Sequence, residues 1–312
     1  MVYSGYSIAA IAKPMLALAT AWQQVLVIRF FDRLGKGIRD SARDAIISES
    51  SGLGVGRSFG FHRSLDTLGA VIGPLIAVAL FGILSFRGLF LLAFVPGIIA
   101  TVLVVFFVRE TAAGPRSTQL YKVSFRSFDA NFRVFHVGLA LFFVGNSSDV
   151  FLFLRAQNLG VPTLVVPLLY LIMNVIYAVS AFPFGILSDK IGRKTVLLLG
   201  FAVFFLVYLG FALASSSLVV WVLFPVYGLY YGITDGATKA LISDLAPSHL
   251  KATAFGTYYF VVGAVAFPAS LIAGTLWQTL GPTFAFLYGA IMAIAAVLII
   301  GFFVHSERRV QL

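Results

Sequence analysis

Long apolar segments limit what this chain can fold into more than any other feature of its sequence. A helix needs about 20 apolar residues to cross a bilayer, and ten segments approach or exceed that length. Sixty per cent of the 312 residues are hydrophobic and 11% are charged, against about 25% charged in a soluble domain. The sequence therefore predicts an all-α integral membrane protein whose ten helices cover residues 4–20, 22–48, 57–84, 88–108, 133–156, 163–187, 195–214, 218–244, 253–277 and 283–304.

The distribution of basic residues predicts the orientation of these helices. If the second helix ends in the cytoplasm, most of the 22 lysines and arginines lie on that side, whereas the other side has only Arg87 and Arg155. Cytoplasmic loops of membrane proteins carry such an excess. The net charge of +10 therefore indicates a multi-pass protein with a cytoplasmic C-terminus, and it does not predict a nucleic-acid partner.

Enzymatic and metal-binding signatures are missing from the sequence. It contains no cysteine, its four histidines are scattered, and it has neither an H-E-x-x-H motif nor a phosphate-binding loop. We therefore expect no enzyme, no catalytic residue, no metal site and no cofactor.

An internal repeat divides the chain. GIRDSARDAIISE, starting at Gly37, matches GITDGATKALISD, starting at Gly232, and SFGF and GAVIGP recur as AFGT and GAVAFP. The offset of about 195 residues aligns the first four helices with the last four, as in transporters built from parallel repeats. The prediction is a partial N-terminal half at 1–108, a cytoplasmic linker at 109–132 and a six-helix half at 133–312. On this pattern two further helices are expected before Met1.

The second helix carries an unusual stripe of charge between residues 25 and 49. At helical spacing its charged side chains share one face. An unpaired charge in hydrocarbon costs at least about 3 kcal/mol, so this face is expected to contact a partner helix or a wet cavity. The stripe consists of Arg29, Arg33, Lys36, Asp40 and Arg43 or Asp44.

The segment GILSDKIGRK resembles the cytoplasmic loop signature of the major facilitator superfamily. The matching residues are Gly185, Asp189, Gly192, Arg193 and Lys194. The resemblance implies a cytoplasmic gate in which Asp189 faces the start of the third helix near Arg57 and Ser58, and Arg193 reaches Asp244. Glu49 is the repeat equivalent of Asp244 and is assigned to the same gate. Basic residues that only set topology are the alternative.

Two more segments resemble signatures of this superfamily. VLVIRFFDRLGKG looks like its arginine motif, with Arg29 as the central arginine and with Asp32 and Arg33 as departures from the pattern. The third helix has the spacing of the antiporter signature but lacks its closing glycine pair. Its small residues predict a helix-packing seam that lets the helix pack closely and bend, formed by Gly60, Gly69, Gly73 and Pro74.

The resemblance implies a twelve-helix proton antiporter fold that lacks its first two helices. The expected function is proton-coupled antiport or efflux of a small molecule by alternating access, by a monomer in a bacterial-type inner membrane. Proton-coupled uptake of an organic anion is the second hypothesis, because basic residues outnumber acidic ones around the second helix. A non-transporting sensor or assembly subunit is the third.

Polar residues inside the predicted helices are candidates for the substrate and proton cavity. Several have simpler explanations: Arg29 and Asp32 pair with each other, Asp66 pairs with Arg63 or His62, Asp149 pairs with Arg155, and Tyr227 anchors at the interface. Asp40 and Asp235 occupy equivalent repeat positions. The candidates are Lys13, Arg29, Asp32, Arg33, Asp66, Asn146, Asp149, Asn174, Tyr227 and Asp235.

Overall fold

The computed structural model describes residues 7, 11–12, 14–52, 54–80, 83–107 and 125–305. These residues form helices, and no strand occurs among them. Among the described residues, eight helical stretches are long and apolar enough to cross a membrane. The predicted all-α membrane fold is confirmed. Helix α2 is also long enough to cross but carries the charged stripe.

The first part of the chain forms four named helices and a short helical stretch before them. Residues 11–12 and 14–18 are helical, whereas Lys13 lies outside the described residues. The predicted helix at 88–108 is divided after Leu92, because Ala93 ends one helix and the next begins at Phe94. The four helices are α2 (Trp22–Ser50), α3 (Val55–Leu80), α4 (Phe86–Leu92) and α5 (Phe94–Phe107).

The second part of the chain begins with a short 3-10 turn and contains seven helices. Their bounds lie within a few residues of the prediction, except at 133–156, which is divided in two. The helices are α6 (Ala130–Gly145), α7 (Val150–Asn158), α8 (Val166–Ile191), α9 (Arg193–Leu213), α10 (Ser217–Leu245), α11 (Lys251–Thr279) and α12 (Pro282–Phe303). The 3-10 turns are η1 (Phe125–Ser127), η2 (Thr163–Val165) and η3 (Ser248–Leu250).

The break between α6 and α7 corrects the prediction of one helix over 133–156. The segment Asn-Ser-Ser-Asp at 146–149 separates the two helices, and its side chains are those that favour turns by bonding to nearby backbone. Asn146 ends α6 and Asp149 precedes α7. The break places these two polar side chains at the same level of the bundle.

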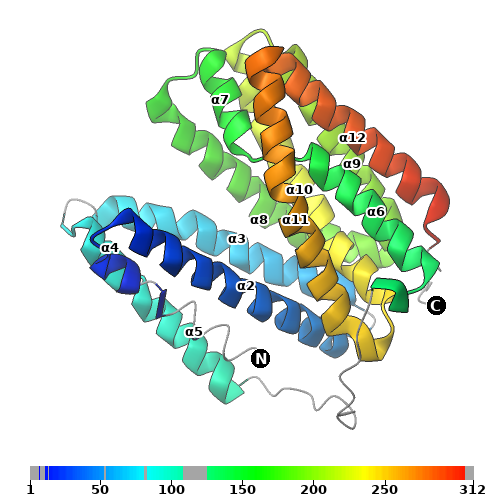
Figure 1. The fold of residues 1–312 in the computed structure, drawn as a ribbon, viewed down its shortest axis with the longest axis horizontal. Helices are drawn as coiled ribbons and strands as arrows, with labels where there is room; N and C mark the ends of the chain where they lie inside the picture. Colours follow the sequence, from blue (N-terminus) through cyan, green and yellow to red (C-terminus); the bar gives the residue numbers. More distant parts are fainter. Residues whose placement is uncertain are drawn as a thin grey trace.

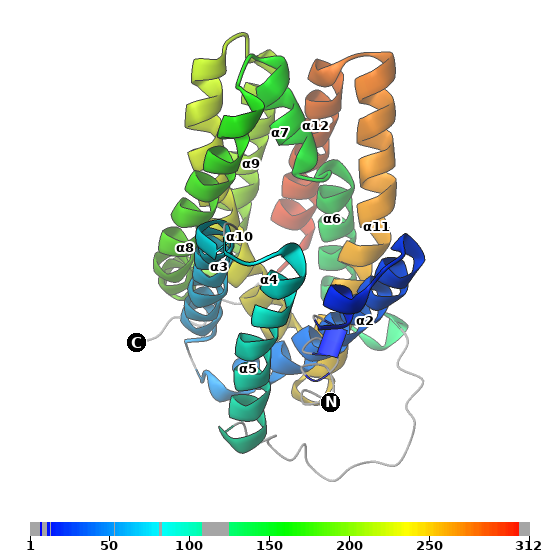
Figure 2. The same cartoon turned by 90° about the vertical axis from the view of Figure 1, so that its left-hand side faces the viewer.

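Helices α6 and α8 to α12 form a bundle around an aromatic core. Figures 1 and 2 show this bundle with α2 and α3 beside it: both approach it at one end and lie away from it at the other. Helix α3 packs against α8 and α10, and α2 packs against α11. The core contains fully buried rings, including Phe132, Phe142, Phe201, Phe204 and Tyr208.

Glycines permit the close approach of α3 to α8. A Cβ at Gly60 would collide with the carbonyl oxygen of Ala181 and would stand 3.0 Å from the Cα of Gly185. A Cβ at Gly56 would stand 2.9 Å from Asp189 Oδ1. Backbones this close require glycine.

The predicted seam is correct only at its first glycine. Gly69 and Gly73 have no atom of the described chain within 4 Å of where a Cβ would stand, so these two positions make no close helix contact there. Pro74 lies inside α3, and the helix continues to Leu80. The described seam therefore involves the first half of α3, and Gly56 takes part in it although the sequence did not single it out.

Equivalent positions of the internal repeat meet where α2 and α3 contact α10 and α11. Ser48 Oγ lies 2.5 Å from Ser243 Oγ, 195 residues further along the chain. Phe59 packs against Phe255 with ring centroids 5.7 Å apart. Contacts between equivalent residues are expected at a two-fold pseudosymmetry axis, so the repeat has a direct structural counterpart.

Candidate functional site

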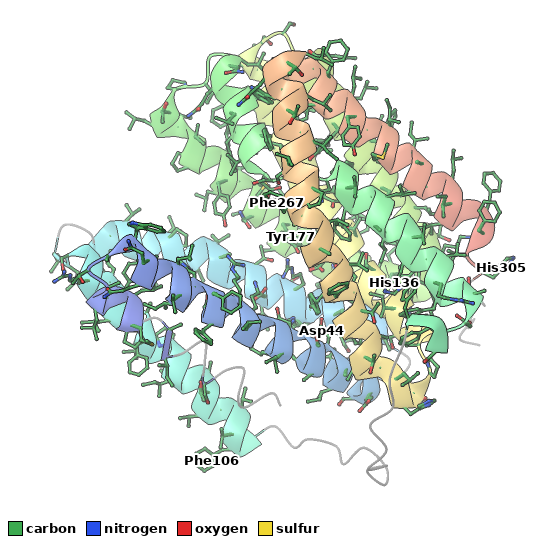
Figure 3. All side chains as sticks on the ribbon, in the orientation of Figure 1. Asp44, Phe106, His136, Tyr177, Phe267 and His305 are labelled. Carbon is green, nitrogen blue, oxygen red and sulfur yellow. The ribbon has the colours of Figure 1, made fainter. Side chains whose placement is uncertain are left out.

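A charged network joins α2 and α3 to α10 at the end where the two groups of helices meet. Asp44 of α2 is fully buried and lies 3.2 Å from Lys239 Nζ of α10. These two residues are repeat equivalents. Tyr259 of α11 donates a 2.6 Å hydrogen bond to the same carboxylate. Figure 3 labels Asp44 near this end of α2.

Arg63 of α3 is the second cation of the charged network. It forms an ion pair with Asp235 of α10 and a 3.0 Å pair with Asp66 of its own helix. Arg63 Nε also donates to the hydroxyl of Tyr177, which in turn donates a 2.9 Å hydrogen bond to Asp235. The predicted pairing of Asp66 with Arg63 is confirmed, whereas the ion pair with Asp235 was not predicted.

The charged side chains of the network have partners of opposite sign. Lys239 lies 3.2 Å from Asp44 and 3.9 Å from Asp235 and so links the two acids. Arg43 pairs with Asp44 at 2.8 Å and with Asp40 at 3.0 Å. Buried charges are tolerated when each has an opposite partner and hydrogen bonds. Asp40, Asp44 and Asp235 therefore each face at least one of the cations Arg43, Arg63 and Lys239.

Asp149 has different surroundings. Its carboxylate accepts hydrogen bonds from Tyr227 at 2.8 Å and from Tyr231 at 3.1 Å. No lysine or arginine in the described part of the chain forms an ion pair with it. The alternative pairing with Arg155 is wrong, because Arg155 donates instead to the carbonyls of Phe211 and Ala214 at the end of α9.

A cluster of tyrosines surrounds Asp149 and Asn146. Asn146 accepts hydrogen bonds of 3.4 Å from Tyr208 and from Tyr227 and donates one of 3.2 Å to Tyr230. Tyr227 is fully buried, so it holds the acid in place and has no free face for stacking on a substrate or for anchoring at the interface. We call Tyr208, Tyr227, Tyr230 and Tyr231 the tyrosine cluster.

Tyr177 connects the tyrosine cluster to the charged network. Its ring stacks on Tyr231 with centroids 5.1 Å apart and planes 21° apart. Its hydroxyl contacts Arg63 and Asp235. A continuous path of contacts therefore leads from Asp149 to the ion pair between α3 and α10.

The contacts predicted for the gate are present. Asp189 accepts from the backbone nitrogens of Gly56 at 2.9 Å and Arg57 at 2.7 Å, at the start of α3, where a carboxylate complements the helix dipole. Arg193 forms ion pairs with Asp189 and Asp244. Gly192 has a φ of 102° in the turn between α8 and α9, a backbone conformation that favours glycine.

Lys194 and Glu49 have different positions in the same region. Lys194 donates 2.7 Å hydrogen bonds to the carbonyls of Gly301 and Val304 at the end of α12. The lysine thus satisfies carbonyl groups that the helix end leaves without a partner. Glu49 is exposed near the end of α2.

The part of α2 that carries Arg29, Arg33 and Lys36 is exposed. Arg29 lies 3.8 Å from Asp32, as the alternative predicted, and 54% of the arginine side chain is accessible. Arg33 and Lys36 are also exposed. This part of the helix therefore presents positive charge on the surface of the described chain, outside the charged network.

Within the described part of the chain, Asn174 forms no hydrogen bond to the charged network or to the tyrosine cluster. It is buried on α8 and donates a 2.8 Å hydrogen bond to the carbonyl of Tyr170 one turn earlier. This bond within its own helix satisfies the amide donor. The geometry gives Asn174 a structural position in the bundle.

Sequence reasoning missed Tyr177 and Lys239, and it named Arg63 only as a partner of Asp66. The repeat contained the signal for Lys239, because Asp44 and Lys239 are aligned in the two copies and a pseudosymmetry axis brings such positions together. Tyr177 lies outside both copies. No pattern in the sequence connects it to Arg63.

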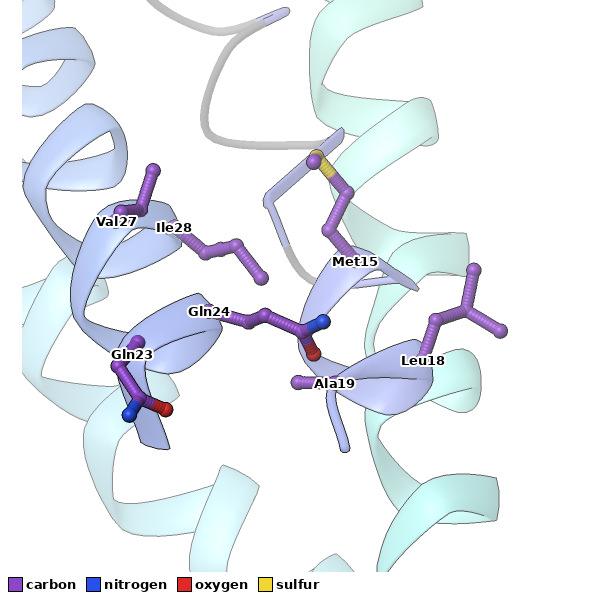
Figure 4. Close-up of a pocket in the computed structure, with 7 residues that line it drawn as sticks. All are labelled: Met15, Leu18, Ala19, Gln23, Gln24, Val27 and Ile28. Atoms are coloured by element: carbon purple, nitrogen blue, oxygen red, sulfur yellow. The ribbon is translucent and has the colours of Figure 1, made fainter. Parts of the chain in front are cut away.

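A surface pocket lies elsewhere, between the helical residues 14–18 and the start of α2. Its volume is about 500 Å³. Figure 4 shows its walls, which are apolar apart from Gln23 and Gln24. It contains none of the charged or tyrosine residues described above, and so its chemistry does not match the candidate site. The lining residues are Met15, Leu18, Ala19, Gln23, Gln24, Val27 and Ile28.

Comparisons with solved structures support the fold. The human organic anion transporter MFSD10 superposes with a TM-score of 0.81 over 96% of this chain and 76% of its own, at 15% identity. The proton:xylose symporter XylE gives a TM-score of 0.77 over 97% of this chain and 80% of its own, also at 15% identity.

Sequence comparisons agree. An uncharacterized MFS-type transporter of Methanocaldococcus jannaschii is 38% identical over 309 residues, which are 96% of this chain and 77% of the relative. An uncharacterized protein of Mycobacterium tuberculosis is 25% identical over 287 residues, 88% of this chain and 69% of its own length. The model of the Major Facilitator Superfamily matches residues 1–269 and 134–311. The chain therefore belongs to the major facilitator superfamily, and it is a multi-pass membrane transporter of small molecules and not an enzyme.

Proposed function

We propose that this protein is a proton-coupled secondary active transporter in which Asp149 carries the proton. The observation that supports the proposal best is the contrast in the partners of the described acids. Asp149 contacts only neutral tyrosine hydroxyls, whereas Asp40, Asp44 and Asp235 contact cations. A partly buried carboxylate without a counter-charge favours its neutral, protonated form, so Asp149 can take up and release a proton.

The transport cycle we propose is alternating access. The ion pairs that join α2 and α3 to α10, together with the contacts of Asp189 and Arg193, close one end of the molecule. At the other end Leu75 of α3 and Leu168 of α8 are exposed. We assign the closed end to the cytoplasm on the basic residues of the loops, so this arrangement opens to the outside of a cell inner membrane.

The organisation of the chain in this proposal follows the repeat. Two halves at 1–108 and 133–312, joined by the linker at 109–132, rock about the contact between repeat equivalents. The C-terminus lies in the cytoplasm, and the monomer is the working unit.

Antiport is the first choice of coupling direction because α3 carries the antiporter spacing of Gly60, Gly69, Gly73 and Pro74. Exchange requires that proton and substrate occupy the site in alternation. The tyrosines around Asp149 are neutral, so protonation of this one carboxylate changes the charge of the site from negative to neutral. Such a change suits the exchange of a proton for a substrate.

Uptake of an organic anion is the second candidate function. Arg29, Arg33 and Lys36 form an exposed basic face on the outer part of α2. Such a face attracts anionic groups. In this case the proton at Asp149 travels in the same direction as the substrate.

Transport in proteoliposomes tests the proposal. A library of small molecules is screened against liposomes that carry a pH gradient and an internal pH dye, and each hit is then tested with variants. We expect Asp149→Asn to abolish proton movement with the substrate, whereas Asp32→Asn, at a partly exposed acid outside the tyrosine cluster, leaves it in place. Proton-coupled flux that persists in Asp149→Asn contradicts the assignment of the proton to this residue.

A further inference from the structure

We propose that Tyr177 is a positioning residue that links the protonation of Asp149 to the ion pair between α3 and α10. The inference rests on the proposed role of Asp149. It concerns how a change at that acid reaches the helices that move. Tyr177 is buried and lies on α8, and Figure 3 labels it above Asp44 in that view.

The hydroxyl of Tyr177 is placed within the inter-helix ion pair. It accepts from Arg63 Nε and donates to Asp235 Oδ2 at 2.9 Å, and the Arg63 guanidinium lies 5.1 Å from the centre of its ring. A hydroxyl that accepts from the cation and donates to the anion orients both partners. A displacement of this ring therefore changes the geometry of the pair that holds α3 to α10.

The ring of Tyr177 lies against the tyrosine that senses Asp149. Tyr231 donates to Asp149 and stacks on Tyr177. An ionised carboxylate accepts from both Tyr227 and Tyr231, but a protonated acid is itself a donor and keeps less accepting capacity. Tyr231 lies 3.1 Å from Oδ1 and 3.3 Å from Oδ2 of Asp149, so a proton on Oδ2 removes one of these two acceptors and weakens the hold of the carboxyl group on Tyr231. A shift of the Tyr231 ring then displaces the ring of Tyr177 that is stacked on it.

Apart from His62, whose Nδ1 is buried and has no hydrogen-bond partner among the described residues, the charged groups facing this path are paired. Asp66 pairs with Arg63, and Lys239 pairs with Asp44 and lies 3.9 Å from Asp235. Asp149 is therefore the acid whose change of charge has no balancing partner along the path. The titratable and charged groups that face the path from Asp149 to the ion pair are Arg63, His62 and Asp66 of α3, Tyr227, Tyr230, Tyr231, Asp235 and Lys239 of α10, Tyr258 and Tyr259 of α11, Arg43 and Asp44 of α2, and Tyr208 of α9.

Distance measurements between spin labels test the inference without a known substrate. The sequence has no cysteine, so Leu75→Cys and Leu168→Cys place labels on α3 and α8 without background. Both positions are exposed. The labelled full chain in nanodiscs is measured across a pH series. With Tyr177 present, we expect low pH to shift the population toward the shorter distance, because protonation of Asp149 loosens the closed end.

Tyr177→Phe keeps the ring but removes the hydroxyl. We expect this variant to lose the pH-dependent shift and to keep a folded bundle, and we expect Tyr231→Phe to do the same because it removes the hydrogen bond to Asp149. Tyr170→Phe is the matched control on the same helix, because its exposed ring lies on the surface, and it should respond as the parent does.

The outcomes separate the two proposals. If Tyr177→Phe responds to pH like the parent while Asp149→Asn does not respond, the role of Tyr177 is wrong and that of Asp149 stands. If Tyr177→Phe shifts the distances equally at every pH, its role is structural and the inference is again wrong. If the parent does not respond to pH, or Asp149→Asn still does, the proton assignment fails and the inference fails with it.

Discussion

The end of the molecule where α3 meets α10, which we propose is closed, and the region around Asp149 use the same residue types in opposite ways. At the closed end, Asp235 contacts Arg63, Lys239 and Tyr177. Away from it, the hydrogen bonds that the Asp149 carboxylate accepts within the described residues come from tyrosines. The two acids have similar neighbours except for the cations, so the cations decide which acid keeps a fixed charge.

The same contrast holds for glycines and arginines. Gly60 touches the backbone of α8, whereas Gly73 has open space around it in the described part of the chain. Arg63 joins two helices, whereas Arg29 contacts an acid on its own helix. Residue type therefore identifies candidate functional residues, but the partner across the helix interface determines what each residue does.

The acids give the largest expected difference. Asp235→Asn removes the anion that Arg63 and Lys239 share, but Arg63 keeps Asp66 and Lys239 keeps Asp44 as partners. We therefore expect a loss at the lower end of the range of about 3–5 kcal/mol that breaking a buried pair costs. Asp149→Asn leaves no cation unpaired and retains an oxygen that accepts from the tyrosines, so we expect a change below about 1 kcal/mol. Unfolding of the purified variants in detergent measures both.

A single result decides whether the acids differ as proposed. Equal loss of stability in the two variants means that Asp149 is also held as a compensated anion, and the contrast between the two ends is then wrong. Arg63→Gln combined with Asp235→Asn is the control. Removal of both partners should cost less than the sum of the single losses, because no charge remains buried alone.

The loop signature predicted the gate contacts well, and the reason is local. The carboxylate of Asp189 needed the free nitrogens at the start of a helix, and the sequence identified both the acid and that helix start. Arg193 and Asp244 were likewise named together. The sequence also predicted the helices of the second half closely, because each is a long apolar segment bounded by polar residues.

The charged network could not be predicted in the same way. Its ion pairs join residues far apart in the chain, and helical spacing places charges on a face without specifying what lies opposite. The repeat offset would have brought Asp44 to Lys239, but Arg63 and Tyr177 have no such relation to Asp235. The break at 146–149 was missed for another reason, since the apolar length of 133–156 outweighed the turn residues within it.

The glycines of α3 give an intermediate difference. Gly60→Ala adds a Cβ that collides with the carbonyl of Ala181, and overpacking of this kind costs about 1–3 kcal/mol. Gly73→Ala adds the same atom where no described atom lies within 4 Å, so we expect no loss of stability. Thermal unfolding in detergent and the yield of folded protein compare the two. A seam that depends equally on both glycines would lose stability equally in both variants.

The arginines test the comparison at its smallest scale. Arg29 and Asp32 are 3.8 Å apart with more than half of the arginine exposed, and exposed pairs contribute about 0–1 kcal/mol. A double-mutant cycle of Arg29→Gln and Asp32→Asn should therefore give a coupling energy near the lower end of this range. The matched cycle of Arg63→Gln and Asp235→Asn should give several times more, because these side chains are largely shielded from solvent and share Tyr177. If the first cycle gives the larger coupling energy, the Arg29–Asp32 pair of α2 contributes at least as much as the Arg63–Asp235 pair. In that case the position of a charged residue relative to the contact between α3 and α10 does not explain its coupling energy.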